Sequence, residues 1–347
     1  MNIKNIGIYE VSTDCLSCEP LIERAPNGDL VCVCQQGGME EPSPKNREYV
    51  FLSKDNGKTW SERKSIYPED GNAVYGTELA VIGDEITAYI VVHSGGFLDC
   101  KAIMMKSFDN GNTWVNCGAP PYFSDYVFMR GAMTTRKGEI IMPYHWFPIT
   151  KEEHDRVLKD TEDITKHIAH TKTETCETGV LKSCDNGKTY QKYTSCVIDM
   201  TKYGWTWTEP TIAELSDGSI SMLMRHECSG WLYRCDSKDG GKNWGEFYKT
   251  DIPNPTNKPR LFNLEHGNIA LVHTPNCNID ETGYGKRNPY ELWISNDDMK
   301  TWYKKIRLTD FPGEYHYTDG FYEDGHLYFV VEHNRHTILF FDVEFEC

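Results

Sequence analysis

The octapeptide SKDNGKTW, residues 53–60, decides the fold, because the chain repeats its pattern. The pattern is Ser, one residue, Asp, three residues, Thr or Asn, and then Trp or Tyr. Four further copies follow: SFDNGNTW (107–114), SCDNGKTY (183–190), SKDGGKNW (237–244) and the degenerate SNDDMKTW (295–302). An Asp side chain accepts hydrogen bonds from backbone N–H groups two or more residues later, and Gly or Asn tolerates a positive φ. Each copy therefore predicts a β-hairpin turn with a structural role rather than a catalytic one.

The spacing of the octapeptides predicts the size of the repeating unit. Successive copies begin 54, 76, 54 and 58 residues apart. A spacing near 54 residues suits one four-stranded blade of a β-propeller. The longer gap contains residues 151–167, a charged stretch that is compatible with a helix and poor in strand formers. We interpret it as a short helical insertion at about 150–170, and not as a second domain.

A second repeat runs out of phase with the first and predicts the number of blades. Each copy reads as a strand, a polar turn and another strand. The six copies are 19–30, 77–86, 130–140, 209–220, 260–269 and 317–327. Six inner strands predict a single all-β domain over residues 1–347, a six-bladed β-propeller whose last blade lacks the octapeptide. The alternating run 337–346 is expected to pair with 6–11 and close the ring, which removes exposed sheet edges.

Composition and charge exclude several classes of partner. The chain has 347 residues, of which 39% are hydrophobic and 12% aromatic, enough to bury a sizeable core. Its net charge is −16 and it has no basic stripe, so nucleic acid and anionic membrane surfaces are not expected partners. The first residues contain no apolar leader, and no run reaches the roughly 18 apolar residues of a membrane span. A cytoplasmic protein is expected.

The cysteines allow two interpretations. Without a secretory leader, the thirteen cysteines are not expected to form a disulfide framework. Cys15 and Cys18, followed by Cys32 and Cys34, have a spacing that could hold zinc. Alternation in the strand-like run LVCVCQ offers a simpler account, because Cys32 and Cys34 would share one face and pack there. We therefore predict no metal and no cofactor.

The innermost strands of a propeller line its axis, so the starts of the six second-repeat copies should meet. Charged and phenolic groups gathered there would be costly without a ligand or mutual pairing. This favours a polar binding site, with an ion-pair network that plugs the channel as the alternative. The positions are Cys18 and Glu19, Glu78, Arg130, Glu209, Arg260 and Tyr317.

Three longer stretches carry a resemblance to a known family. They are EPTIAELSDGSISMLMR (209–225), KRNPYELWISNDDMKTW (286–302) and HYTDGFYEDGHLYFVVE (316–332). Together with the octapeptides, which match the family's Asp boxes, they make the chain from about residue 18 to 346 resemble the sialidase (neuraminidase) superfamily of glycoside hydrolases. The resemblance implies a propeller with a carbohydrate site at its centre.

The resemblance also implies roles for individual residues. Tyr317 matches the nucleophilic tyrosine, which retaining sialidases use in place of a carboxylate. A phenol with a pKa near 10 needs a base, and the match gives that role to Glu209. Arg225 and Arg287 match two of the three arginines that bind a sugar carboxylate through charge-assisted hydrogen bonds.

The chain departs from the family at its first inner strand. Where the family has Arg-Ile-Pro, which supplies the first arginine, this chain reads Cys18-Glu19-Pro20. The first arginine is therefore absent from its usual position. Two arginines would bind a carboxylate more weakly than three, and Glu19 would repel it.

The acid of the reaction is a second departure. The family's aspartate lies in the loop after the first blade's opening strands, and here that loop, 35–48, offers only Glu40, Glu41 and Glu48. The sequence does not choose among the three, and Glu48 is carried forward as the predicted acid. Solvated loop glutamates are the alternative interpretation.

The predicted function is that of an exo-glycoside hydrolase that removes a terminal acidic sugar from an oligosaccharide or glycoside. Substrate-binding candidates besides the two arginines are Glu19, Arg130, His145, Trp207 and His316. One alternative keeps the fold and is a different glycosidase or a lyase, which uses Glu19 and Glu209 as a carboxylate pair on a neutral or uronic sugar, an arrangement that resembles the exo-arabinanases. The other is a glycan-binding propeller without catalysis.

Overall fold

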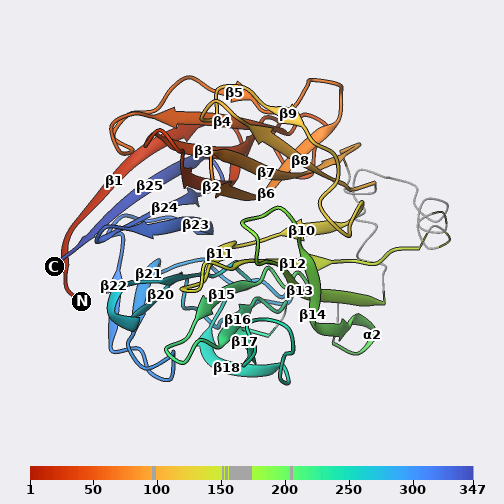
Figure 1. The fold of residues 1–347 in the computed structure, drawn as a ribbon. Helices are drawn as coiled ribbons and strands as arrows, with labels where there is room; N and C mark the ends of the chain where they lie inside the picture. Colours follow the sequence, from red (N-terminus) through yellow and green to blue (C-terminus); the bar gives the residue numbers. More distant parts are fainter. Residues whose placement is uncertain are drawn as a thin grey trace.

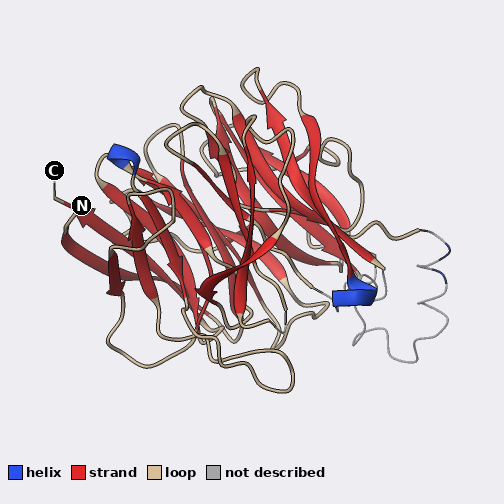
Figure 2. Ribbon diagram, turned by 90° about the horizontal axis from the view of Figure 1, so that it is seen from below, coloured by secondary structure: helices blue, strands red, loops and turns tan. Residues whose placement is uncertain are grey.

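The computed structural model describes residues 1–95, 99–150, 152, 155, 174–203, 206–227 and 229–346. The insertion expected at about 150–170 lies almost wholly outside these residues. In the described part, antiparallel sheets stand around a central axis (Figure 1), and strands account for nearly all regular structure (Figure 2). The helical elements are α2 (Met200–Tyr203) and the 3-10 turn η2 (Glu265–Gly267). The all-β, six-bladed propeller predicted from the sequence is confirmed.

The blades follow one another along the chain, and each runs from an inner strand to an outer one. Blade 1 contains β2 (Ser17–Arg24), β3 (Leu30–Gln36), β4 (Arg47–Ser53) and β5 (Lys64–Ser65). Blade 2 contains β6 (Ala73–Ile82), β7 (Glu85–His93), β8 (Lys101–Ser107) and β9 (Val115–Asn116). Blade 3 contains β10 (Val127–Met129), β11 (Met133–Thr134), β12 (Ile140–Trp146), β13 (Thr175–Ser183) and β14 (Gln191–Asp199).

The remaining blades complete the ring. Blade 4 contains β15 (Thr211–Glu214), β16 (Ile220–Met224), β17 (Trp231–Ser237) and β18 (Tyr248–Pro253). Blade 5 contains β19 (Arg260–Asn263), β20 (Ile269–His273), β21 (Glu291–Ser295) and β22 (Lys304–Arg307). Blade 6 contains β23 (Tyr315–Glu323), β24 (His326–His333), β25 (Thr337–Phe345) and, as its outer strand, β1 (Ile3–Thr13).

The two ends of the chain close the ring within blade 6. Strand β1 pairs antiparallel with β25, from Ile3 opposite Phe345 to Thr13 opposite Thr337 (Figure 1). The closure predicted between the N-terminal and C-terminal strands is therefore present. It joins the first strand of the chain to the last, so the sheet edges that an open array would expose are paired.

The octapeptides form the hairpin turns expected of them. In the first copy, Asp55 Oδ1 accepts a hydrogen bond from the N–H of Thr59 at 2.9 Å, and its Oδ2 accepts one from the Thr59 hydroxyl at 2.7 Å. The Trp60 indole N–H donates to the carbonyl of Gly57 at 3.1 Å. The other four copies repeat the Asp contacts. Gly57 has φ 84°, and a Cβ there would lie 2.1 Å from the Phe340 ring, so this turn requires glycine.

These turns make stability depend on acid pH. Hydrogen bonds from the Thr or Asn four residues later lower the pKa of Asp55, Asp185, Asp239 and Asp297 to about 2. An unfolded Asp has a pKa of about 3.9. Because the folded pKa is the lower one, the stabilisation is complete above about pH 4 and is lost as the pH falls toward 2.

We expect the free energy of unfolding, measured by urea titration, to fall more steeply between about pH 4 and pH 2 in the wild type than in Asp185→Asn. The substitution removes one titrating carboxylate and keeps an acceptor oxygen in its place. Parallel pH curves for the two proteins would show that the turn carboxylate is not linked to folding.

The apolar core lies between neighbouring sheets. Val33 of blade 1 packs in one cluster with Leu79 of blade 2. Val272 of blade 5 packs in another with Phe329 of blade 6. All four side chains are buried. Inside these cores, inner strands of neighbouring blades contact one another around the axis, as β2 does with β6 and β23.

Candidate functional site

Three side chains reach the axis from an unusual backbone conformation. Glu19, Glu209 and Tyr317 have φ of 51°, 34° and 48°, a region that costs a residue other than glycine about 1–3 kcal/mol. Two of them, Glu19 and Tyr317, lie in β-bulges, where the register of β2 on β3 and of β23 on β24 shifts. A bulge re-aims a side chain, and strain of this kind is concentrated at functional sites.

Arg225 joins the predicted nucleophile to the predicted base. Its Nη1 donates to Glu209 Oε2 at 2.7 Å and to the hydroxyl oxygen of Tyr317 at 3.1 Å. Its Nη2 donates to Glu227. The side chains of Arg225 and Glu209 are 2% exposed, whereas Tyr317 is half-buried and borders a cavity. The structure thus brings together three residues that lie far apart in the sequence.

The charges around this group favour a carboxylate base next to a neutral phenol. Burial raises the pKa of Glu209, but Arg225 and Arg130 outweigh it and hold that pKa below its usual value. Burial and the nearby carboxylates of Glu209 and Glu19 raise the pKa of Tyr317 well above its usual value. Tyr317 therefore keeps its proton at neutral pH, and Glu209 is ionised and can accept it.

Arg287 contacts the other side of the tyrosine group. Its Nη1 lies 2.6 Å from Nδ1 of His316, and its Nη2 donates to the carbonyl of Thr256 at 2.8 Å. Its guanidinium carbon lies 5.6 Å from the centre of the Tyr317 ring. Burial lowers the pKa of His316 to about 3, so the imidazole is neutral and its Nδ1 can accept from Arg287.

Two adjoining cavities open over these residues. The first has a volume of 360 Å³, and three arginines line it together with Trp207 and Tyr317. The second has a volume of 540 Å³ and borders the loop that contains Glu40 and Glu41. The residues shared by both cavities are Glu314, His316 and Arg335.

The third arginine, Arg335, was missed by the sequence analysis. It lies in the turn between β24 and β25 with φ 58°. Its Nη2 donates to Glu41, and its Nε lies 3.7 Å from Glu332 Oε1. The other oxygen of Glu332 accepts the N–H of Glu19 at 2.8 Å, next to the position from which the family's first arginine is absent. No sequence signal marked Arg335, because the stretch around it reads as an ordinary hairpin turn.

Glu19 and Arg130 lie behind Glu209. Arg130 Nη1 donates to Glu19 Oε2 at 3.2 Å, and its Nη2 lies 3.8 Å from Glu209 Oε1. Both residues are buried, and neither is among the described residues that line the two cavities. Burial, opposed by Arg130, raises the pKa of Glu19 to about 8. Glu19 and Arg130 were predicted to bind substrate, but their positions suit them instead to holding Glu209 in place.

Glu48 lies away from the cavities, so the geometry does not support its predicted role as the acid. It is in β4, fully buried, and its Oε2 accepts the N–H of Gly76 at 3.0 Å. Because this hydrogen bond holds the Glu48 carboxylate against the neighbouring inner strand, the carboxylate does not reach a substrate in either cavity. Of the loop glutamates, Glu40 and Glu41 line the second cavity instead.

Of the three aromatic residues predicted to bind substrate, Trp207 and His316 line a cavity and His145 does not. Trp207 lines the first cavity. His145 is fully buried, stacks on Phe128 with ring centres 4.9 Å apart, and lies 5.3 Å from the Trp207 ring. Its surroundings make His145 a packing residue that supports Trp207 from behind. His316 lines both cavities, as a binding residue would.

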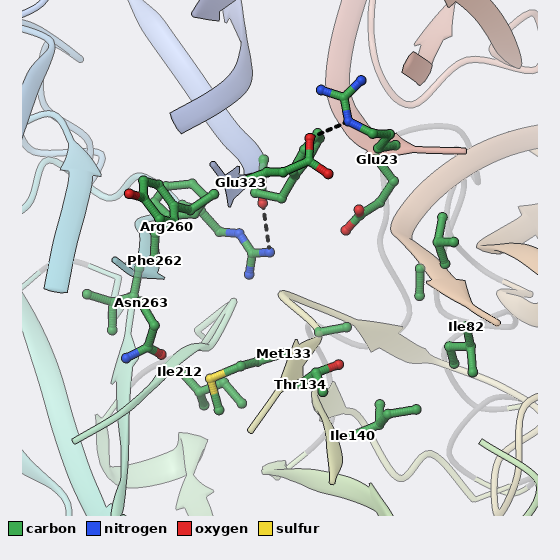
Figure 3. Close-up of a pocket in the computed structure, with 18 residues that line it drawn as sticks. Glu23, Ile82, Met133, Thr134, Ile140, Ile212, Arg260, Phe262, Asn263 and Glu323 are labelled. Carbon is green, nitrogen blue, oxygen red and sulfur yellow. Dashed lines mark hydrogen bonds and ion pairs between the residues drawn. The ribbon is translucent and has the colours of Figure 1, made fainter. Parts of the chain in front are cut away.

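The opposite end of the axis has its own opening, a cavity of 430 Å³ formed by the last residues of the inner strands. Figure 3 shows Arg260 and Glu23 projecting into it. Arg260 lies 3.2 Å from Asp319, and Glu78 accepts the N–H of Ala132 at 3.0 Å. The expectation that Arg260 meets the other strand starts is therefore wrong. Lys258, two residues before Arg260 and buried, is the cation of this segment whose charge lowers the pKa of Glu19 and of Glu209.

The structure also bears on the predictions about metal ions, cysteines and membranes. Among the residues that the structure describes, no group of three or more His, Cys, Asp or Glu side chains is placed to hold a metal ion. Cys32 and Cys34 are fully buried in an apolar cluster between blades 1 and 6, in keeping with the packing interpretation. Within the same described part, no helix is long and apolar enough to cross a membrane.

Comparisons with known proteins identify similar chains. A family model described as a BNR repeat-like domain matches residues 69–329. A search of curated proteins finds no match. A solved protein of unknown function from Dyadobacter fermentans has a TM-score of 0.71 at 14% identity, with 99% of this chain and 100% of that chain covered.

Two of the similar structures are sialidases. For a Hadza microbial sialidase the TM-score is 0.69 at 15% identity, over 95% of this chain and 66% of that one. For Trypanosoma rangeli sialidase in complex with the inhibitor DANA, the TM-score is 0.63 at 13% identity, with 96% of this chain and 55% of that chain covered. The chain thus spans roughly one half to two thirds of these two enzymes. At such identities the likeness shows the fold alone.

Proposed function

Because the chain belongs to the BNR repeat-like domain family and shares its fold with sialidases, we propose that it is an exo-glycoside hydrolase that removes a terminal acidic sugar of the sialic acid type. One observation carries the proposal. A single guanidinium nitrogen of Arg225 holds both the Glu209 carboxylate and the Tyr317 hydroxyl, and Tyr317 borders the cavity. A nucleophile, its base and a cation thus share one site.

The chemistry follows from these positions. The Tyr317 oxygen attacks the anomeric carbon, and its proton passes to Glu209. The bond from that carbon to the leaving-group oxygen breaks, and this oxygen takes a proton from an acid. Water then attacks the anomeric carbon and gives a proton to the conjugate base of that acid, the bond from this carbon to the tyrosine oxygen breaks, and the phenol recovers its proton from Glu209. Arg225 stabilises the charge that develops on the phenol oxygen, from 3.1 Å in the resting site.

The cavity suits a sugar with a negative charge. Arg225, Arg287 and Arg335 all line it, and an arginine fork matches the geometry of a carboxylate. Trp207 and Tyr284 add ring faces on which an apolar face of a sugar can rest. A neutral sugar would offer these arginines no anion and would gain less from the cavity than a charged sugar does, which disfavours it.

Glu41 is the best candidate for the acid. Glu314 lines both cavities, but its interaction with His316, whose Nε2 lies 3.7 Å from its Oε2, lowers its pKa, so it is poorly suited to donating a proton. Glu40 is exposed to solvent. Glu41 is half-buried at the second cavity and contacts Arg335, which belongs to both cavities. Glu41 therefore replaces Glu48 in this role.

A second glycosidase mechanism has one observation in its favour. Arg130 bridges Glu19 and Glu209, and the pKa of Glu19 is raised to about 8 while that of Glu209 is lowered, as in an acid and base pair. Against it, Glu19 is 3% exposed and borders neither cavity. We therefore rank it below the tyrosine mechanism.

A panel of aryl glycosides tests the proposal. We expect the wild-type protein to hydrolyse an aryl α-sialoside and to release the α-anomer first, seen by proton NMR, because two displacements retain configuration. Arabinosides and uronides in the panel serve as comparison substrates. Turnover of an arabinoside alone would favour the Glu19 and Glu209 mechanism, and binding of sialic acid without turnover of any glycoside would favour a non-catalytic propeller.

A further inference from the structure

The three arginines of the cavity differ in how fully they are paired. Arg225 is 2% exposed and is held by Glu209, Tyr317 and Glu227. Arg287 is held by His316 and a backbone carbonyl. Arg335 has a side chain that is 37% exposed, and it is the one whose guanidinium reaches both cavities. Its geometry leaves it the most accessible to an incoming anion.

Several polar atoms around Arg335 lack hydrogen-bond partners. Within the described chain, the Arg335 Nε atom, the Glu332 Oε1 atom and the Glu41 Oε1 atom are buried and have no hydrogen-bond partner. A buried polar atom without a partner destabilises the protein, so each of these atoms favours a ligand that supplies one. Nε faces Glu332 from 3.7 Å, too far for a hydrogen bond. A carboxylate with two acceptor oxygens could complete the hydrogen bonding of this arginine.

Glu41 occupies the place that such a carboxylate would need. It is 294 residues from Arg335 in the sequence, and its Oε2 accepts from Arg335 Nη2. Two carboxylates at one guanidinium repel each other unless one of them takes up a proton. A negatively charged ligand in the first cavity and an ionised Glu41 are therefore competitors.

We propose that Arg335 binds the carboxylate of the substrate, and that the substrate displaces Glu41 from Arg335 and thereby converts Glu41 into the proton donor. The inference rests on the proposed function and deepens it, since it ties recognition of an acidic sugar to activation of the acid. A neutral sugar would leave the Arg335–Glu41 ion pair intact and Glu41 unable to donate.

The proton balance is closed. Glu41 takes one proton from solvent as the anionic sugar binds. It gives this proton to the glycosidic oxygen when the bond to the leaving group breaks and Tyr317 bonds to the anomeric carbon. The Glu41 carboxylate then accepts a proton from the water that hydrolyses the intermediate. Release of the sugar restores the Arg335–Glu41 pair and returns one proton to solvent.

Calorimetry with two probes tests the proposal. N-acetylneuraminic acid carries the carboxylate, and its methyl ester does not. We expect Arg335→Gln to weaken binding of the acid about 10- to 100-fold and to leave binding of the ester unchanged. Glu41→Gln is expected to tighten binding of the acid several-fold, because it removes the competing anion. In buffers of different ionisation enthalpy, the wild type should take up a proton on binding the acid, and Glu41→Gln should not.

Kinetics supply a second readout. Glu41→Gln is expected to lower kcat/KM for a sialyl disaccharide by about 10²-fold or more and to change kcat/KM little for an aryl sialoside, because kcat/KM reports cleavage of the glycosidic bond and an aryl leaving group needs no acid. The matched control is Arg24→Gln, which breaks the Arg24–Glu323 ion pair at the opposite opening. It should change neither the affinity nor the proton uptake.

Two outcomes would overturn the inference in distinguishable ways. A wild-type protein that hydrolyses sialosides, combined with Arg335→Gln that binds the acid as well as wild type or Glu41→Gln that binds it more weakly, would reject the exchange and leave the proposed function standing. A wild-type protein that neither binds the acid nor hydrolyses any sialoside would reject both.

Discussion

Tyr317→Phe is expected to lower kcat for an aryl sialoside by about 10³- to 10⁶-fold, the range that follows removal of a nucleophile that acts as part of a unit. The substitution deletes only the oxygen that accepts from Arg225 at 3.1 Å. The ring remains, so its contact with the Arg287 guanidinium at 5.6 Å and the folding of the protein should be preserved. Steady-state kinetics, together with a thermal melt to confirm folding, measure the effect.

The control for this variant lies on the same strand. Tyr322 is near the other end of β23 and borders the opposite cavity, so Tyr322→Phe removes a hydroxyl from the same element without touching the proposed site. We expect its kcat to stay within about twofold of wild type. Near-wild-type turnover by Tyr317→Phe would falsify the tyrosine mechanism and direct attention to Glu19 and Glu209.

Arg225→Met is expected to destabilise the protein by about 3–5 kcal/mol, the cost of removing one partner from a buried ion pair. Arg225 is 2% exposed and holds two buried carboxylates, Glu209 and Glu227. Without it, each carboxylate is left buried next to the other. Urea unfolding monitored by tryptophan fluorescence measures the loss.

The pH dependence identifies the cause. Arg225 lowers the pKa of both carboxylates against the effect of burial, so its removal raises both values. A raised carboxyl pKa costs nothing below the unfolded value near 4.3 and costs more as pH rises above it. The deficit of Arg225→Met should therefore be larger at about pH 8 than at about pH 5.

Two comparison proteins accompany this measurement. Adding Glu227→Gln to Arg225→Met should recover part of the stability, because one uncompensated charge is removed. Arg136→Met breaks an ion pair with Glu214 whose arginine side chain is 56% exposed, and should cost less than about 1 kcal/mol. An equal deficit for the two arginine variants, with no dependence on pH, would show that charge burial is not what makes Arg225 important.

The hairpin turns were predictable because the hydrogen bonds that form them lie within short segments of the sequence. In each octapeptide the Asp, the turn and the donor four residues later lie within eight residues, so the hairpin is encoded wherever the pattern occurs. The count of inner strands then limited the ring to six blades, as observed. For the site, the matches to the family singled out Glu209, Arg225 and Tyr317, and the structure brings them into contact.

The pairing around Arg335 was beyond sequence reasoning for an equally physical reason. Arg335 and Glu41 are 294 residues apart, in a turn of blade 6 and a loop of blade 1. They meet only because β1 closes the ring on β25 and makes the first and last blades neighbours. Nothing in either segment alone indicates the other.

Register caused the remaining errors. Whether Glu48 or Glu41 reaches a cavity depends on where β4 begins. Because β4 begins at Arg47, Glu48 lies within the strand, where its side chain accepts a hydrogen bond from Gly76. Arg260 likewise lies at the opposite opening, and the charge that acts on Glu19 and Glu209 comes from Lys258, two residues earlier. By itself, the sequence determined the hairpins, through interactions within short segments, and the number of blades, through the count of inner strands. Its resemblance to a family singled out three residues that the structure brings together. Only the tertiary structure decided which arginine and which glutamate complete the site, because contacts between blades depend on closure and strand register rather than on any local pattern.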